Sequence, residues 1–201
     1  MQNMTGRELN KLWKDYFVVS FVRNPFQRAV SMYRMFMREV ELGGTEDRTY
    51  TWNQFCADPA GFGAKCEADE KCKTRGGQSY TFTHMQPQMD CMVTEGGGWA
   101  VDFIGRVEHM DEDLQAVLDE LERRREADVP PVRPLENGLR HYNERGCNHS
   151  KEELERLAAL GKPMAKEQYC EPEQYYEGQH AACLRAIPHH YASDVHMLGF
   201  D

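Results

Sequence analysis

The sequence predicts an α/β fold in which a parallel sheet lies between two layers of helices. Two apolar segments, residues 17–22 and 99–105, are each followed by a helical pattern. An apolar run that is short and lacks polar alternation is typical of a strand buried on both faces of a parallel sheet. At 201 residues the chain is long enough for one domain with a sizeable core, so we expect a single domain over residues 1–201.

The first strand is joined to its helix at Arg23. Asn24 is a favoured N-cap, and Pro25 is a favoured first helical residue because the N–H that proline lacks would be unpaired there. We expect the helix to continue to about residue 39. Its apolar face is formed by residues spaced three or four apart, namely Phe26, Val30, Tyr33 and Met37.

This joint is unusually basic. Residues 16–38 hold four arginines and no acidic residue, in a chain of net charge -9. Arg23 follows the carboxyl end of the predicted strand, where open α/β sheets place their ligands. Ser31 and Arg28 share a face of the following helix, whose N-terminus attracts anions. These residues predict a phosphate-monoester site; alternatively, Arg23 only covers the sheet edge and Ser31 is an incidental helix serine.

A block of eleven residues around this joint resembles a known motif. It reads FVRNPFQRAVS, residues 21–31. It is similar to the 3′-phosphate-binding motif of sulfotransferases that use 3′-phosphoadenosine 5′-phosphosulfate (PAPS), and is closest to the Golgi carbohydrate (type 2) branch. The resemblance implies that Arg23 and Ser31 hold the 3′-phosphate of PAPS, with Arg28 at the same site. It also implies the three-layer fold that sulfotransferases share with P-loop nucleotide kinases.

Two further blocks follow in the order of the same branch. Residues 102–114 resemble its DFIGRxExxxxDL block, and residues 191–200 resemble its YxxDxxxLGY terminus. Arg106 is expected to face the nucleotide and Glu108 to cap or orient a neighbouring group, although a purely structural role is open for both. The helix after them starts with an acidic turn. We expect its apolar stripe to be buried, namely Leu114, Val117, Leu118 and Leu121.

His84 is the candidate catalytic residue. Residues 84–88 resemble an H-x-x-P-Q segment of carbohydrate sulfotransferases. An imidazole can take the proton from an acceptor hydroxyl as that hydroxyl attacks sulfur. Gln88 is a candidate donor to a sulfate oxygen. The alternative is that His84 only forms a hydrogen bond in the core or lines the pocket.

Shorter helices are also predicted, one of them over residues 150–160. The first covers residues 5–13, with Thr5 as N-cap and Glu8 completing a capping box. Another short helix is expected over residues 51–56, and the last over residues 175–187.

The seven cysteines indicate an oxidising compartment. Their number is odd, so at least one is free or pairs outside the chain. We expect disulfides; reduced thiols and a zinc site are the alternatives, and the spacing of Cys66 and Cys72 does not fit a zinc knuckle. With the resemblance, this predicts the Golgi lumen for the full-length form, with the cytoplasm as the alternative.

Composition excludes some classes of protein. A pI near 5.4 argues against general nucleic-acid binding, since basic residues are in excess only around the arginine cluster. No apolar stretch approaches the 18 residues of a membrane span, so we expect a membrane contact only through an N-terminal anchor outside these residues.

The resemblance implies a specific reaction. A sulfuryl group would pass from PAPS to a hydroxyl, on a carbohydrate, by in-line displacement without a metal, and 3′,5′-adenosine bisphosphate (PAP) would be released. The family's 5′-phosphosulfate loop, K-x-G-x-[ST], should precede the arginine motif, but the 22 residues before Arg23 lack it. We therefore expect an N-terminally incomplete fragment that is inactive as it stands. The alternative is a non-catalytic binding protein that keeps the 3′-phosphate half-site.

Overall fold

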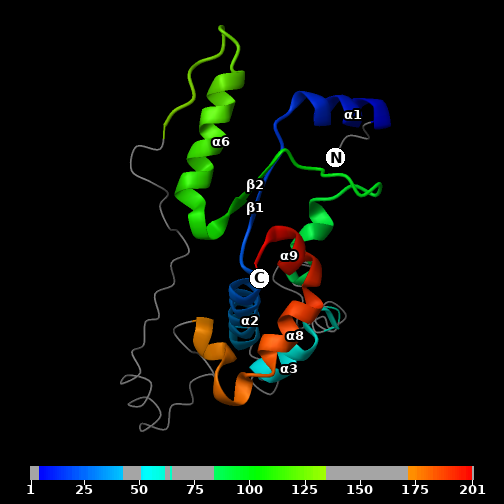
Figure 1. Ribbon diagram of the computed structural model, residues 1–201, viewed down its shortest axis with the longest axis vertical. Helices are drawn as coiled ribbons and strands as arrows, with labels where there is room; N and C mark the ends of the chain where they lie inside the picture. The colour runs from blue at the N-terminus through cyan, green and yellow to red at the C-terminus, as the bar shows by residue number, and fades with distance from the viewer. Residues whose placement is uncertain (1–4, 43–50, 62–63, 65–83, 135–171, 201) are drawn as a thin grey trace. The chain divides into compact units, whose positions relative to one another are not determined.

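The computed structural model describes residues 5–42, 51–61, 64, 84–134 and 172–200, which belong to two compact units (Figure 1). Unit 1 consists of Met1–Asn24 and Gln88–Tyr142, and unit 2 consists of Pro25–Pro87 and Asn143–Asp201.

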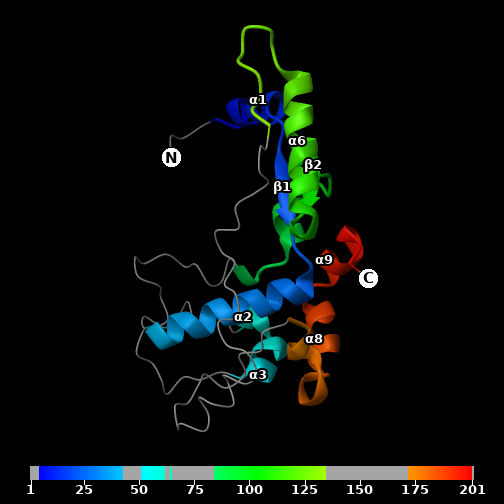
Figure 2. The same ribbon diagram turned by 90° about the vertical axis from the view of Figure 1, so that its left-hand side faces the viewer.

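Unit 1 contains a small parallel sheet and one long helix. Its elements are α1 (Gly6–Asp15), β1 (Val19–Val22), η2 (Gln88–Cys91), β2 (Phe103–Arg106), η3 (Val107–His109) and α6 (Met110–Arg124). Val19 lies opposite Phe103 and Val22 opposite Arg106, so the two strands run in the same direction. Helix α6 packs against β2, and Figure 2 shows it running beside the sheet. The predicted mixture of helices with a parallel sheet is confirmed.

The strands are shorter and more exposed than predicted. β1 begins at Val19 instead of residue 17, and Val19 is 37% exposed whereas Val22 is buried. Trp99 does not start β2; it forms an isolated antiparallel bridge with Val93. The described sheet has two strands and α6 packs on β2, so β1 keeps exposed surface. Burial of β1 on both faces is therefore wrong for the described residues, and they do not show three layers.

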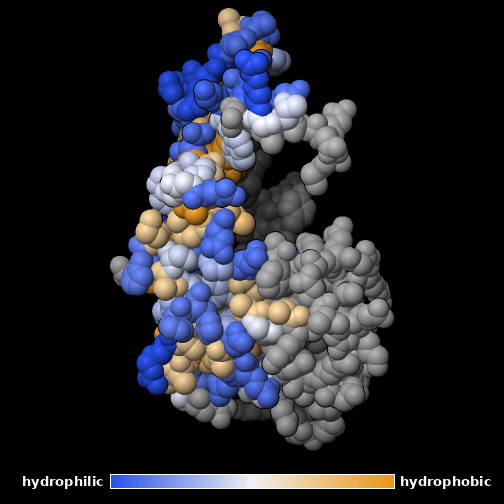
Figure 3. Space-filling model, turned by 90° about the vertical axis from the view of Figure 1, so that its right-hand side faces the viewer, coloured by the Kyte–Doolittle hydropathy of each residue, from blue (hydrophilic) through white to orange (hydrophobic). Residues whose placement is uncertain are grey.

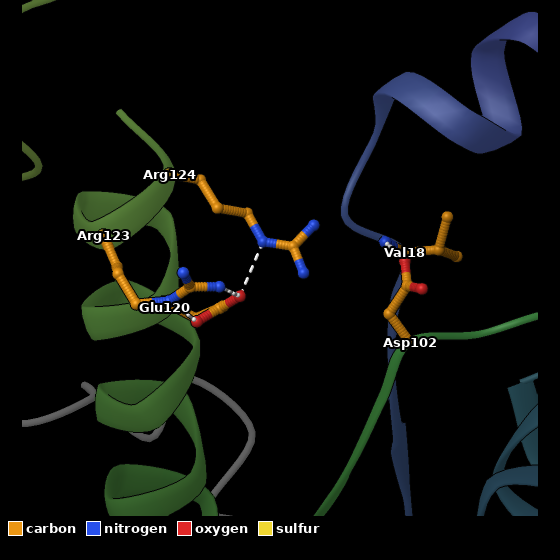
Figure 4. A network of polar contacts seen from close by, with 5 residues as sticks. All are labelled: Val18, Asp102, Glu120, Arg123 and Arg124. Carbon is orange, nitrogen blue, oxygen red and sulfur yellow. Dashed lines mark hydrogen bonds and ion pairs between the residues drawn. The ribbon is translucent and has the colours of Figure 1, made fainter. Parts of the chain in front are cut away.

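Side chains fix the start of β1. The Asp102 carboxylate accepts a hydrogen bond from the Val18 N–H at 2.8 Å, while the Asp102 N–H donates to the Val18 carbonyl, also at 2.8 Å (Figure 4). These two hydrogen bonds between Val18 and Asp102 extend the pairing of the strands by one residue before Val19. Asp102, the first residue of the second sequence block, therefore holds the start of β1 in place.

The helices of unit 1 confirm most of the local predictions. The α1 capping box is present, with the Thr5 N–H 2.8 Å from the Glu8 carboxylate and the Glu8 N–H 3.4 Å from the Thr5 hydroxyl. The acidic first turn of α6 is also present. In its apolar stripe Val117 is buried, but Leu121 is 39% exposed. Full burial of the stripe is therefore wrong, since Leu121 in the last turn of α6 keeps exposed surface.

The elements that the structure describes in unit 2 are all helical. They are α2 (Pro25–Leu42), α3 (Trp52–Ala57), η4 (Pro172–Tyr176), η5 (Gly178–His180), α8 (Cys183–His190) and α9 (Ala192–Leu198). The helix predicted over residues 150–160 lies outside the described residues. The α2 helix starts at Pro25, as predicted, and packs against α3, α8 and η4. Thr51 and Gln54 form the capping box of α3. The predicted single helix over residues 175–187 is wrong: two 3₁₀ turns precede α8, and Gly178 has a left-handed φ of 55° that interrupts any helix.

Aromatic rings form the core of unit 2. Tyr33 of α2 packs against Trp52, Phe55 and Tyr175 with ring centroids 5.4, 5.5 and 6.1 Å apart. Trp52, Phe55 and Tyr175 have no exposed surface, and Tyr33 is 2% exposed. Offset and edge-on aromatic pairs of this kind stabilise a core by more than the burial of their apolar surface alone would. This core fixes α2 relative to α3 and η4.

A disulfide links Cys56 of α3 to Cys183 of α8 across 127 residues of sequence. The prediction that some of the seven cysteines are paired is confirmed. Among the described cysteines, Cys91 is a free and exposed thiol. The pair Cys66 and Cys72 lies outside the described residues.

The surface of the described residues carries both hydrophilic and hydrophobic side chains. Figure 3 shows one face on which hydrophobic side chains lie in small areas between hydrophilic ones. None of the helices in the described ranges combines the length and the apolar composition that a membrane-spanning helix needs.

Candidate nucleotide site

Two arginines lie at the carboxyl edge of the sheet in unit 1. Arg23 follows Val22, the last residue of β1, and Arg106 is the last residue of β2. Val22 and Arg106 are partners in the parallel register, so both arginines come to the same edge. Both are partly buried. This edge therefore concentrates positive charge where a parallel sheet offers space to a ligand.

The backbone at Arg23 is held by the side chain of Gln88. The Arg23 N–H donates to Gln88 Oε1 at 2.8 Å, and Gln88 Nε2 donates to the Arg23 carbonyl at 2.9 Å. The following N–H, that of Asn24, donates to the Glu108 carboxylate at 2.7 Å. The prediction that Glu108 caps a neighbouring group is confirmed. Donation from Gln88 to a sulfate oxygen stays a prediction.

Arg106 is fixed in a similar way. Its N–H donates to the carboxylate of Asp113 in the first turn of α6 at 2.5 Å. Three acidic residues of the second sequence block thus accept backbone hydrogen bonds, Asp102 from Val18, Glu108 from Asn24 and Asp113 from Arg106. Glu108 and Asp113 do so at the carboxyl ends of the two strands, where Arg23 and Arg106 lie.

Ser31 lies on α2 in unit 2, and its side chain is exposed. It is eight residues beyond Arg23, and its hydroxyl is accessible to a ligand. The predicted contact of Arg23 and Ser31 with one phosphate stays a prediction that depends on the sequence motif.

Arg28 lies one turn before Ser31 and is in contact with three groups of unit 2. Its guanidinium is 3.7 Å from the carboxylate of Asp194, which is fully buried, and 5.7 Å from the centre of the Tyr191 ring. It also donates to the His84 carbonyl at 2.7 Å. These contacts give Arg28 a structural role in unit 2, and its predicted contact with the nucleotide stays a prediction.

The backbone of His84 and Met85 is held from two sides. Arg28 binds the His84 carbonyl, and the Tyr191 hydroxyl donates to the Met85 carbonyl at 3.0 Å. Burial raises the pKa of Tyr191, so the phenol stays protonated and remains a donor. The His84 side chain is half-buried. The segment that carries the candidate base is thus fixed by α2 and by the residue between α8 and α9.

Sequence reasoning missed the roles of Tyr191, Asp194 and Gln88. The first two belong to the terminal block, and Gln88 belongs to the H-x-x-P-Q segment. Nothing in their spacing indicates Arg28 or Arg23 as partners, because those contacts span 65 to 166 residues of sequence. Among the described residues, no three side chains of the metal-ligating types gather in one place.

One comparison with known proteins identifies the family. A family model described as "Sulfotransferase family" matches residues 1–168, a range that includes Arg23, Ser31, His84 and Arg106. No curated protein sequence matches the chain significantly. No solved structure does so either. The family match covers most of the chain, which therefore belongs to the sulfotransferase family.

Proposed function

We propose that the protein transfers a sulfuryl group from PAPS to a hydroxyl, and that the hydroxyl belongs to a carbohydrate. Its family supports sulfuryl transfer in general. The observation that carries the proposal for the donor is the position of Arg23, at the carboxyl end of a parallel strand and within the motif that resembles a 3′-phosphate site. The resemblance to the type 2 branch supports the carbohydrate acceptor.

In this proposal Arg23 and Ser31 bind the 3′-phosphate. A guanidinium presents paired N–H donors that match two phosphate oxygens, and the serine hydroxyl adds a further donor. Arg106 at the same sheet edge contributes positive charge toward the nucleotide. Arg28 lies in the same motif and is a further candidate for binding the nucleotide, in addition to its contacts with Asp194 and His84.

The transfer step uses the acceptor hydroxyl as nucleophile. Its oxygen forms a bond to sulfur while the bond between sulfur and the phosphate oxygen of PAPS breaks. The hydroxyl proton passes to a base, for which we propose His84, and PAP leaves with the bonding electron pair. Fixed cationic and N–H donors stabilise the negative charge that develops on the leaving group. No step in this scheme uses a metal.

The compartment that we propose is the Golgi lumen. The Cys56–Cys183 disulfide supports it, because such bonds persist in oxidising compartments and are rare in the cytosol. The resemblance to the Golgi carbohydrate branch supports the same compartment.

Calorimetry with two nucleotides tests the donor site. PAP and 5′-AMP differ by the 3′-phosphate, so the protein should bind PAP more tightly. Arg23→Ala should weaken PAP binding about tenfold and leave 5′-AMP binding nearly unchanged, since a charge-assisted bond contributes roughly 1.5–3 kcal/mol. Arg123→Ala on α6, which removes a surface arginine, is the matched control. Equal affinity for both nucleotides would overturn the assignment.

A transfer assay tests the reaction itself. With labelled PAPS and a panel of glycans, residues 1–201 alone should give no sulfated product, whereas the same chain joined to a K-x-G-x-[ST] segment should give one. In the joined form, His84→Ala should slow product formation about 10²-fold or more. Binding of PAP without any transfer by the joined form would favour a non-catalytic protein that keeps the 3′-phosphate half-site.

A further inference from the structure

We infer that Gln88 is a positioning residue for Arg23 and, together with Glu108, fixes the backbone of the proposed 3′-phosphate site. The inference rests on the proposed function and goes beyond it, because it assigns to Gln88 and Glu108 a role that acts through the backbone of Arg23 and Asn24. All the contacts that carry it lie within unit 1.

The Gln88 carboxamide acts as a neighbouring strand would. A carboxamide carries a donor and an acceptor, and Arg23 receives both, at 2.9 Å on its carbonyl and at 2.8 Å on its N–H. In a sheet these two backbone groups would bond to an adjacent strand. β1 ends at Val22, so Gln88 extends its hydrogen bonding by one residue. That residue is the one whose side chain we propose binds phosphate.

Gln88 is itself firmly placed. It is the first residue of the η2 turn, and it is followed by Met89, which is 4% exposed. Met92, 1% exposed, donates its N–H to the Met89 carbonyl at 3.0 Å and closes the turn. Two buried methionines thus anchor the turn, so the carboxamide has little freedom to move with Arg23.

Glu108 fixes the next peptide. Its carboxylate accepts the Asn24 N–H at 2.7 Å, and it lies two residues beyond Arg106. Two consecutive N–H groups, those of Arg23 and Asn24, are therefore bonded to side chains. A carboxylate repels a phosphate, so Glu108 serves the site by fixing the backbone and not as a ligand. A guanidinium whose backbone is fixed at two successive peptides loses less freedom on binding a phosphate.

The experiment compares the affinities for PAP and 5′-AMP in matched glutamine variants. Gln88→Ala removes both bonds to Arg23, whereas Gln115→Ala removes a glutamine that bonds to Asp119 on the surface of α6. We expect Gln88→Ala to lower the PAP to 5′-AMP affinity ratio about fivefold to tenfold, and Gln115→Ala to leave it unchanged. A loss of folding alone would weaken both nucleotides equally and leave the ratio unchanged.

Two further variants separate position from charge. Gln88→Glu keeps the size and one acceptor, but loses the donor to the Arg23 carbonyl and should lower the ratio at least as far as Gln88→Ala. Glu108→Gln keeps an acceptor for the Asn24 N–H and should retain or raise PAP affinity, while Glu108→Ala should lower the ratio. Nuclear magnetic resonance of the unmodified protein adds a measurement that needs no variant. The Gln88 carboxamide resonances should shift more with PAP than with 5′-AMP.

The outcomes are distinguishable. If the unmodified protein binds PAP no better than 5′-AMP, the proposed donor site fails and the positioning role fails with it. If it prefers PAP but the Gln88 variants keep the same ratio, the positioning role is overturned and the donor site stands. If the Gln88 variants do not fold, carboxamide resonances that respond equally to both nucleotides overturn the positioning role.

Discussion

The two units of the molecule are stabilised in different ways. Unit 1 relies on a four-residue parallel pairing whose ends are fixed by polar side chains, and it exposes Trp13 and Tyr16 to 56% and 63%. Unit 2 relies on an aromatic core around Trp52, which has no exposed surface, and on a disulfide. The motif at residues 21–31 crosses from the first unit into the second. Within this motif, hydrogen bonds hold the backbone of Arg23 in place, whereas the packing of helix α2 holds Ser31 in place.

This difference predicts separable responses to mutation. Changes in the core of unit 2 should lower global stability, because packing and covalent cross-links contribute the largest single terms. Changes to the polar contacts of unit 1 should cost less stability and act mainly on nucleotide binding, since partly exposed hydrogen bonds contribute about 1 kcal/mol each.

The largest effect is expected from the disulfide. Replacing both cysteines, Cys56→Ser with Cys183→Ser, should lower the free energy of unfolding by up to about 5 kcal/mol, because the bond closes a long loop. Chemical denaturation without reductant measures the loss. Cys91→Ser, which removes an exposed free thiol, should change stability by less than about 0.5 kcal/mol. Similar stability of the double variant and the unmodified protein would contradict this.

The buried ion pair of unit 2 should come next. Asp194→Asn leaves the Arg28 guanidinium next to an uncharged and buried partner, and should cost about 3 kcal/mol of unfolding free energy. Asp119→Asn on the surface of α6 is the matched control. Adding Arg28→Met to Asp194→Asn should restore part of the loss, because the double variant no longer holds a charge without an opposite charge beside it. A double variant less stable than Asp194→Asn would argue against this account.

A substitution at Gly105 tests how much the packing between β1 and β2 contributes to the stability of unit 1. A Cβ at this position in β2 would lie 2.5 Å from the Phe21 ring and 3.1 Å from Asp113 Cβ. Gly105→Ala should therefore force the ring to move, at a cost of about 2 kcal/mol. Gly96→Ala, whose nearest atom is 3.9 Å away in an exposed loop, is the control. If both substitutions have the same effect on the unfolding midpoint, the close packing of β1 on β2 is less important than the structure indicates.

Local interactions were predictable from the sequence. The start of α2 follows from a proline at the first helical position, and the capping box at Thr5 follows from a contact between residues three apart. The motif residues Arg23 and Ser31 could be identified for the same reason, since a contiguous block carries them. The break at Gly178 was missed because a helical pattern does not show where a left-handed residue will interrupt it.

Long-range partners were not predictable. The sequence indicated disulfides but not that Cys56 pairs with Cys183, and it did not indicate that the Gln88 carboxamide bonds to Arg23. Such contacts depend on the tertiary fold, which brings together residues that are far apart in the sequence. Composition and periodicity carry no information on these pairings. Leu121 shows the same limit, because its spacing places it in the apolar stripe of α6 but does not show that its side chain stays exposed.

The smallest effect concerns the charged surface of α6 in unit 1. Hydrogen bonds from Arg123, and then from Arg124, lower the pKa of Glu120 from 4.5 to about 2. Figure 4 shows both arginines beside this carboxylate. A folded-state pKa below the unfolded value means that the stabilisation is present above about pH 4.5 and is lost as the pH falls toward 2.

Glu120→Gln should therefore reduce stability slightly at pH 7, and the difference from the unmodified protein should vanish near pH 2. The effect should be small because exposed ion pairs are screened, and 1 M salt should reduce it further. Nuclear magnetic resonance titration of the Glu120 carboxylate checks the pKa, and thermal unfolding across the acidic range checks the linkage. A Glu120 carboxylate that titrates near 4.5 would show that its hydrogen bonds with Arg123 and Arg124 do not persist in solution. Arg123 and Arg124 would then add charge to the surface of unit 1 without stabilising its helix.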